Sequence, residues 1–217
     1  MKTSKRSKPL LNTENPLWSA LAQAISGQAS CLQAFDEPEI ISLASCHGVD
    51  LLLQANIQAG TVTGIGQSLK KKLKSATYPH VAHDMVLNNA TRKLLDLLAE
   101  NQIPALLLKG TPVAQLYYPQ SYLRPRCDTD IYIDEQDLGQ TAELLSANNY
   151  VLSGLGKRKH SSKQFVAAIE SVQKNFLHFD MHWKLSNRVM FRRTIPFKEC
   201  LRSSQPVTGL GPNAHAL

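Results

Sequence analysis

Two segments with alternating polar and apolar residues place the strongest constraint on the fold. Residues 128–133 read DTDIYI, and residues 176–185 read FLHFDMHWKL. This alternation is typical of a β-strand that buries one face and leaves the other polar. Isolated strands are not stable in water. The chain must therefore build a β-sheet with at least one covered face.

Helical patterns surround these strands. Leucines near helical spacing predict a long amphipathic helix over residues 84–100, and the apolar run IPALLLKG at 103–110 predicts a buried strand. A short helix is expected over residues 111–118, and Asp134 can cap a further helix over residues 136–148. We therefore predict an α+β fold. Residues 150–155 are a candidate strand, whereas residues 165–172 fit a strand or a helix.

The first eighty residues have the pattern of helices. Asn15-Pro16 is a start signal for the first helix, and a capping box formed by Asp36 and Glu39 opens the second. A third apolar segment covers residues 49–57, and the structure of residues 60–78 stays open. These patterns predict three parts. They are a basic tail and helical region at 1–80, a core at 81–204, and a C-terminal tail at 205–217 that begins a further helical region.

The charge balance favours anionic partners. The 217 residues contain 24 Lys and Arg against 17 Asp and Glu, which gives a formal net charge of +7. Such a surplus favours nucleotides, phosphorylated substrates or nucleic acid. However, part of the charge is spread over the basic start of the chain and over a lysine run at residues 70–74. Charge alone therefore does not choose among these partners.

Targeting and redox signals point to the cytoplasm. No apolar run approaches the roughly 18–20 residues that a membrane span needs, so no membrane partner is expected. The basic start has no signal-peptide pattern. The cysteines show no CxxC spacing, which excludes a disulfide framework and a zinc site of that type. They are Cys31, Cys46, Cys127 and Cys200.

Three aspartates on strands are the main candidates for chemistry. Asp128 and Asp130 share one strand face, with backbone positions roughly 6.5–7 Å apart. Asp180 lies on the later strand, and all three carboxylates converge if the two strands are neighbours. Like charges at close range raise a pKa, and Mg²⁺ relieves this because it binds carboxylate and phosphate oxygens. An Asp-x-Asp pair alone is also typical of a solvent-facing strand.

The segment LLLKGTP has the features of a phosphate-binding turn. Gly110 permits close approach of backbone amides to a phosphate, and the helix that Thr111 opens favours an anion at its start. Lys109 adds a point charge. Arg124 or Arg126 could hold phosphate oxygens through the planar guanidinium group.

Residues 103–133 together with residues 179–185 resemble the uncharacterised nucleotidyltransferase family, which belongs to the DNA polymerase beta-like nucleotidyltransferase superfamily. No single motif is specific, but the combination is. The motifs that carry the resemblance are Lys109-Gly110, Tyr118-Pro119, Arg124-Pro125, Asp128 with Asp130, and Asp180 with His182-Trp183.

The resemblance implies a nucleotidyltransferase fold, with a small mixed β-sheet flanked by helices and an N-terminal helical region. It also implies transfer of a nucleoside monophosphate from an NTP such as ATP to a hydroxyl acceptor, with release of pyrophosphate. Asp128 and Asp130 would bind Mg²⁺, or Mn²⁺ in its place. Asp180 would complete the metal site and help to activate the hydroxyl, while Gly110 and Thr111 would receive the triphosphate.

His182 is placed with the substrate-binding residues, either orienting Asp180 or packing beside Trp183. A transition metal on His178, Asp180 and His182 is an alternative. The family pattern also differs here in two ways. The superfamily usually has Gly-Ser at the phosphate turn, where this chain has Lys109-Gly110-Thr111. Its members commonly continue into a further helical region, whereas this sequence stops at Leu217, so that part is expected to be missing or supplied by another chain. The acceptor stays open between a protein, a small molecule and RNA.

Two other functions are compatible with the sequence. The first is a non-catalytic nucleotidyltransferase-like module that binds a partner, as an antitoxin or scaffold does. The presence of all three aspartates, Asp128, Asp130 and Asp180, argues against decay of the site. The second is a basic nucleic-acid-binding protein, although no basic strand with interleaved aromatic residues is present.

Overall fold

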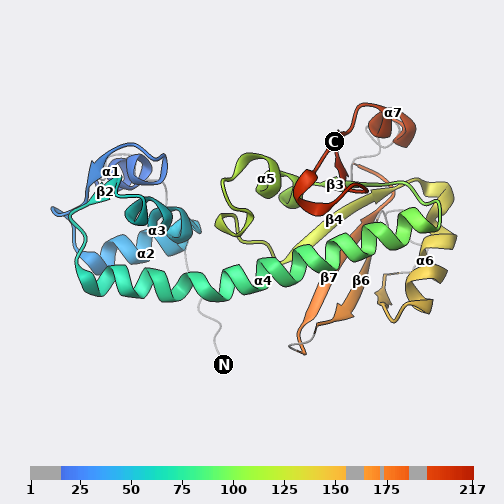
Figure 1. Ribbon diagram of the computed structural model, residues 1–217, viewed down its shortest axis with the longest axis horizontal. Helices are drawn as coiled ribbons and strands as arrows, with labels where there is room; N and C mark the ends of the chain where they lie inside the picture. The colour runs from blue at the N-terminus through green and yellow to red at the C-terminus, as the bar shows by residue number, and fades with distance from the viewer. Residues whose placement is uncertain (1–15, 155–163, 172–173, 186–194) are drawn as a thin grey trace, which may run out of the picture. The chain divides into compact units, whose positions relative to one another are not determined.

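The computed structural model describes residues 16–154, 164–171, 174–185 and 195–217. The basic start of the chain and the cap predicted at Asn15 lie outside these residues. The chain forms two compact units that meet in sequence between Tyr78 and Pro79 (Figure 1). Each unit is described by itself. Among the described residues, no helix has the length and apolar character needed to cross a membrane.

The first unit contains the three predicted helices, a short parallel sheet and the beginning of a fourth helix. Its core consists of apolar side chains from all of these elements, among them Leu21, Ile40, Leu53 and Leu69. The elements are α1 (Pro16–Ile25), β1 (Ser30–Cys31), α2 (Glu37–His47), α3 (Asp50–Gln58), β2 (Val62–Thr63) and the start of α4 (Gln67–Glu100).

Two details of the first unit differ from the sequence-based expectation. Helix α2 does begin after Asp36, but the Asp36 side chain makes no capping hydrogen bond. Instead, the carboxylate of Glu37 accepts a hydrogen bond from the backbone N–H of Gly66. The segment left open at residues 60–78 contributes the first turns of α4, which continues past Pro79 to Glu100.

The second unit is built on a mixed seven-stranded sheet in the order β5-β6-β7-β4-β3-β9-β8, counted over the described residues. Strand β4 pairs parallel with β7, and β3 pairs parallel with β9, while the other pairs are antiparallel. This architecture confirms the predicted mixed sheet with helices. The strands are β3 (Ala105–Leu108), β4 (Asp128–Ile133), β5 (Val151–Ser153), β6 (Gln164–Glu170), β7 (Phe176–His182), β8 (Gln205–Pro206) and β9 (His215–Ala216).

Helices connect these strands. The side chain of Asp134 accepts a hydrogen bond from the backbone N–H of Gln136. It therefore caps the 3-10 turn that precedes α6 rather than the predicted helix itself, whose N-cap residue is Asp137. The helices are α5 (Gly110–Tyr117), α6 (Leu138–Ala147) and α7 (Phe197–Arg202), with short 3-10 turns η1 (Ser121–Leu123), η2 (Glu135–Asp137) and η4 (Thr208–Leu210).

The two faces of the sheet differ in character. One face packs against the leucines of α4, which crosses it in Figure 1. Ile131 and Ile133 of β4 and Phe179 and Met181 of β7 are buried in this core. Because side chains alternate along a strand, the residues between them lie on the opposite face. That face carries the aspartates.

The C-terminal residues belong to the sheet. The expectation was a tail at 205–217, but β9 pairs with β3, with Ala216 opposite Leu107. Leu210, Ala214 and Ala216 are fully or almost fully buried. A strand of two residues is too short to show alternation, so the sequence pattern could not reveal it.

Candidate active site

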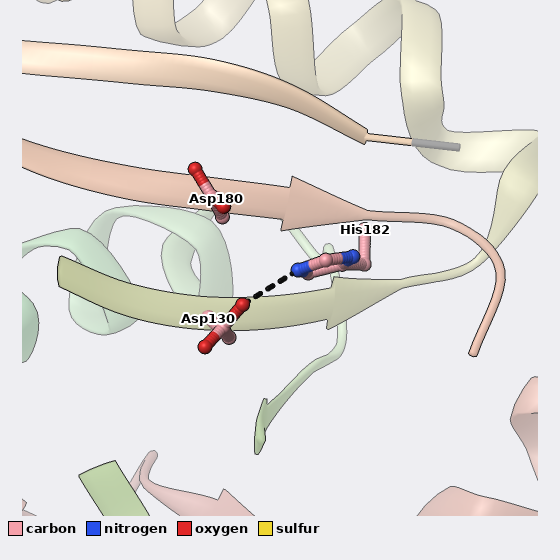
Figure 2. A group of neighbouring side chains, drawn as sticks. All are labelled: Asp130, Asp180 and His182. Carbon is pink, nitrogen blue, oxygen red and sulfur yellow. Dashed lines mark hydrogen bonds and ion pairs between the residues drawn. The ribbon is translucent and has the colours of Figure 1, made fainter. Parts of the chain in front are cut away.

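Strands β4 and β7 are neighbours and run parallel, which brings the predicted carboxylates together. In the register of this pair, Asp130 lies opposite Asp180, and Asp128 lies opposite His178. The condition set by the sequence, that the two strands be adjacent, is therefore met. Figure 2 shows Asp130 and Asp180 on neighbouring strands, with His182 beside them.

Asp130 is held by two basic groups. His182 Nε2 donates a hydrogen bond to Asp130 Oδ1 over 2.7 Å, and the Lys109 ammonium forms an ion pair with the same oxygen. Burial acts to raise the pKa of Asp130, but the hydrogen bonds from His182 and Lys109 and their charges outweigh it. The net result is a pKa below the usual value, so this carboxyl is ionised at neutral pH.

Asp180 lies in a different electrostatic environment. Burial, followed by the negative charge of Asp130, raises its pKa above the usual value. Its carboxylate accepts a hydrogen bond from Gln164 Nε2 over 2.9 Å, a neutral donor on β6. The site therefore contains two adjacent carboxyls whose pKa values are shifted in opposite directions, which is the pattern expected where one of them takes part in proton transfer.

Asp128 lies at the solvent-exposed end of β4. Its charge contributes to the raised pKa of Asp180, so it belongs to the same electrostatic field. It is not a member of the compact group of three potential metal ligands at this site. In the described part of the chain, that group consists of Asp130, Asp180 and His182, whose ligand atoms lie within 4.8 Å of one another.

This donor set fits a divalent cation. Carboxylates are preferred ligands of Mg²⁺ and Mn²⁺, and an imidazole is a preferred ligand of transition metals. Burial and then the charge of Asp130 raise the pKa of Asp180, and a cation beside the two carboxylates would favour the ionised form. Asp130 and Asp180 suit a hard ion, whereas His182 is engaged through Nε2 with Asp130. The sequence-based expectation was that His182 orients Asp180, and the hydrogen bond instead goes to Asp130.

The turn between β3 and α5 lies next to the carboxylates. Lys109 has a φ of 54°, a conformation that costs a residue other than glycine of order 1–3 kcal/mol. Its side chain reaches Asp130 and also lies 3.5 Å from His182 Nε2. Such strained positions cluster at functional sites. The turn therefore presents a cation directly to the acidic group.

Gly110 follows Lys109 and allows an arginine to approach. A Cβ at this position would lie 3.2 Å from Arg124 Nη1, closer than ordinary side-chain contacts. The Arg124 side chain is only half-buried. Of the two arginines proposed for phosphate binding, Arg124 is therefore placed beside the turn and accessible to a ligand.

Arg126 occupies a different environment. Its guanidinium is buried and donates to Asp84 Oδ1 over 2.6 Å, to Asn88 Oδ1 over 2.7 Å and to Thr111 Oγ1 over 2.9 Å. Ser121 completes the network by donating to the other oxygen of Asp84. Arg126 is thus engaged by protein groups, and this geometry favours a role in holding the turn rather than in binding phosphate.

Thr111 connects the network to β4, the strand that carries Asp128 and Asp130. Its hydroxyl lies 3.3 Å from Thr129 Oγ1 on β4, which in turn lies 3.3 Å from Thr91 Oγ1 on α4. All three threonines are buried. Because Thr129 is flanked by Asp128 and Asp130, this chain of hydroxyls fixes the strand that carries both aspartates.

Sequence reasoning missed the residues that support the site. Asp84, Asn88 and Thr91 follow helical spacing on α4, where they form a polar row beside leucines such as Leu87 and Leu94. That row was a usable signal, because polar residues on the buried side of a helix need partners there. Gln164 had no comparable signal, since the segment it begins could not be assigned as strand or helix.

The sheet and the site define a class of protein, in which neighbouring strands present carboxylates beside a glycine turn that opens a helix. A model of the uncharacterised nucleotidyltransferase family matches residues 33–217. The chain therefore belongs to this family, as its motifs predicted, and its general chemistry is nucleotidyl transfer with a nucleotide as substrate. No curated protein and no solved structure is significantly similar to it.

Proposed function

We propose that this protein transfers a nucleoside monophosphate from an NTP to a hydroxyl acceptor and releases pyrophosphate, with Mg²⁺ or Mn²⁺ as the cofactor. The observation that carries this proposal is the pairing of Asp130 with Asp180 on parallel strands, beside the turn at Lys109 and Gly110. Carboxylates and a cationic glycine turn together suit a metal-bound triphosphate.

Asp130 and Asp180 would hold the metal, with Asp128 at the open end of the same face. A divalent cation at this position would neutralise the charge of the phosphates and would act as a Lewis acid that polarises the α-phosphate. Asp130 suits this role because its lowered pKa keeps it ionised. Asp128 is solvent-exposed and can be reached by a second cation that arrives with the nucleotide.

The triphosphate would bind across the start of α5. Backbone N–H groups at Gly110 and Thr111 and the positive end of the helix favour phosphate oxygens. The Lys109 side chain is 62% exposed, so its ammonium can turn from Asp130 to a phosphate. Arg124 can add a two-pronged contact from beside Gly110. Arg126 would act indirectly, by holding Thr111.

The transfer itself needs a proton acceptor. The acceptor oxygen forms a bond to the α-phosphorus while the bond to the pyrophosphate oxygen breaks, and the hydroxyl proton must leave. Asp180 suits this step because it lies opposite Asp130 on the neighbouring strand, where its carboxylate would adjoin both the metal and the attacking hydroxyl. Positioning and charge stabilisation would supply most of the remaining rate enhancement.

The first test is thermal-shift titration of the full chain with each NTP, with and without Mg²⁺ or Mn²⁺. We expect stabilisation that requires both the metal and the nucleotide. Asp130→Asn should abolish it, because the variant removes a ligand charge but keeps the size and the hydrogen-bond acceptor. Pyrophosphate release with the acceptor should fall by roughly 10³-fold or more, since metal catalysis supplies several kcal/mol.

Glu135→Gln is a matched control. Glu135 pairs with Lys184 on the surface outside the acidic group, so its substitution removes one carboxylate charge without touching the site. We expect this variant to keep the metal-dependent shift. No shift with any NTP in the wild-type protein would contradict the proposed site, as would full activity in Asp130→Asn.

A further inference from the structure

In the described part of the first unit, residues 16–78, the lysines lie in one place. Between residues 16 and 78 the only lysines and arginines are Lys70, Lys71, Lys72 and Lys74, all in the first turns of α4. None of them forms an ion pair with a carboxylate within the described ranges of the chain. The cluster is therefore a local concentration of positive charge, although residues 16–78 also contain four acidic residues, Asp36, Glu37, Glu39 and Asp50.

Three of these lysines line a groove between α3 and α4. The groove has a volume of about 370 Å³, which is within the range of small-ligand sites. Each helix contributes residues spaced by three and four positions, which places them on one helix face. From α3 these are Gln54, Ile57 and Gln58, and from α4 they are Gln67, Lys70, Lys71 and Lys74.

The position of the lysines is unfavourable for the helix itself. The N-terminus of a helix carries partial positive charge, so cations near it are unfavourable. The first turn of α4 contains no acidic residue, and the acidic group at its start is the carboxylate of Glu37, which accepts a hydrogen bond from the backbone N–H of Gly66. Lys70 and Lys74 also repel each other at a spacing of four residues. An anion bound in the groove would relieve the repulsion between these lysines.

Gln54 gives a second, independent sign of a ligand. Its side chain lines the groove but is only 7% exposed. Its Oε1 atom has no hydrogen-bond partner among the residues that the structure describes. A buried acceptor without a partner costs roughly 1–3 kcal/mol. Because that oxygen is shielded from solvent, a ligand hydroxyl or amine in the groove would supply the missing hydrogen bond once the Gln54 side chain turns toward it.

We propose that this groove binds a phosphate ester that also carries a hydroxyl group, the chemistry of a ribose phosphate. Lys70, Lys71 and Lys74 neutralise the phosphate, and Gln54 accepts a hydrogen bond from the hydroxyl. The side-chain amides of Gln58 and Gln67 are available for further polar contacts. This site belongs to the first unit and does not depend on the nucleotidyl transfer proposed for the second.

Two sources can supply a ribose phosphate, a free nucleotide or an RNA strand. The test measures binding of AMP by calorimetry and of a short fluorescein-labelled single-stranded RNA by anisotropy. The full chain is used in EDTA, so that no metal-bound nucleotide can occupy the site of the second unit. If RNA is the source, log K should fall with log salt at a slope of about −2, the value for three phosphate contacts on a single strand. If the free nucleotide is the source, AMP should bind and the RNA should gain nothing over it.

The decisive variant replaces Lys70, Lys71 and Lys74 with glutamine. We expect it to weaken binding of the preferred probe by at least tenfold. A second triple variant replaces Lys72, Lys93 and Lys198, which lie outside the groove lining, and removes the same charge. Equal weakening by both triple variants would overturn the proposal, because binding would then follow net charge alone. If neither AMP nor the RNA binds, the proposal is overturned as well.

Gln54→Leu tests the hydroxyl contact. It replaces the buried acceptor with an apolar side chain of similar size, so the unit should stay folded. We expect the wild-type protein to prefer RNA over DNA of the same sequence, or AMP over its 2′-deoxy form, and Gln54→Leu to lose that preference. Equal affinity for the two sugars in the wild-type protein would overturn the role of Gln54.

Discussion

At the scale of single residues, the state of Asp130 depends on the two bases that hold it. Its pKa is lowered because the hydrogen bonds and charges of His182 and Lys109 outweigh the effect of burial. The unfolded chain loses these partners, so its Asp130 binds protons at higher pH than the folded chain does. By linkage, the folded state gains stability from Asp130 above pH 3.8, and that gain disappears as the pH falls through the lower pKa of the folded state.

This linkage predicts the acid stability of Asp130→Asn. The wild-type protein should lose free energy of unfolding below pH 3.8, and the variant should lose less, because asparagine does not titrate. Asp180 has the opposite sign, since its raised pKa makes its ionised form unfavourable in the folded state. Urea unfolding in EDTA over this pH range measures the difference. Parallel curves for the two proteins would contradict the assigned environment of Asp130.

Lys109 predicts a competition between its ammonium and the metal. In Lys109→Met, Asp130 loses a positive partner, so Mn²⁺ should bind more tightly when no nucleotide is present. The gain should be at most about fivefold, because an exposed ion pair contributes up to about 1 kcal/mol. NTP affinity should fall, since a phosphate contact is lost. Calorimetric titration with Mn²⁺ and with NTP separates these effects, and weaker Mn²⁺ binding in the variant would exclude the competition.

The sequence predicted which residue types gather at the site better than it predicted their partners. The alternation in two segments placed Asp128 and Asp130 on the polar face of one strand and Asp180 on the polar face of another. The glycine after Lys109 marked the turn. The sequence could not show that His182 bonds Asp130 rather than Asp180. That choice depends on strand register, which forms between residues more than fifty positions apart.

At the scale of elements, the hydrogen-bond network around the buried pair of Arg126 and Asp84 joins α4, η1, α5 and the segment that leads into β4. Asp84 and Asn88 lie on α4, Ser121 on η1, Thr111 on α5, and Arg126 lies two residues before the start of β4. The pair aligns the phosphate turn with the strand that carries the aspartates. Its energetic importance comes from burial, because removing one partner leaves the other charge without compensation.

We therefore predict that Arg126→Met lowers the free energy of unfolding by about 3–5 kcal/mol. Arg124→Met is the matched control, because Arg124 is more exposed, and it should change stability little. Asp84→Asn combined with Arg126→Met should cost less than the sum of the two single variants, since neither charge is then left alone. Urea unfolding of the wild-type protein, the three single variants and the double variant measures these differences. A small effect of Arg126→Met, similar to that of Arg124→Met, would show that the network does not hold the turn.

Elements with a strong internal pattern were predictable from sequence, and the others required tertiary contacts. Alternation identified β4 and β7, and leucine spacing identified the later half of α4. The earlier half of α4 was left open, because its lysines give no apolar stripe and Pro79 lies inside the helix. Strands β8 and β9 are held by their sheet neighbours and by buried Ala214 and Ala216, so nothing in their own sequence identifies them.

At the scale of the whole molecule, the two units have separate cores. The core of the first unit contains buried residues from Leu17 to Leu73, and the main core of the second contains buried residues from Leu87 to Ala216. No residue belongs to both clusters. Since burial of apolar area is the main stabilising contribution to folding, each unit has its own source of stability within the described residues.

Separate cores predict that damage to one unit spares the chemistry of the other. Leu53 and Leu98 are both completely buried, one in each core, so each change to alanine should cost its own unit about 2–5 kcal/mol. In scanning calorimetry, Leu53→Ala should lower one transition and Leu98→Ala another. Leu53→Ala should also leave the metal-dependent affinity for NTP unchanged at temperatures below both transitions, because the Asp130 site lies entirely in the second unit. A single transition that both variants lower equally would show instead that α4, which is common to both units, couples their unfolding.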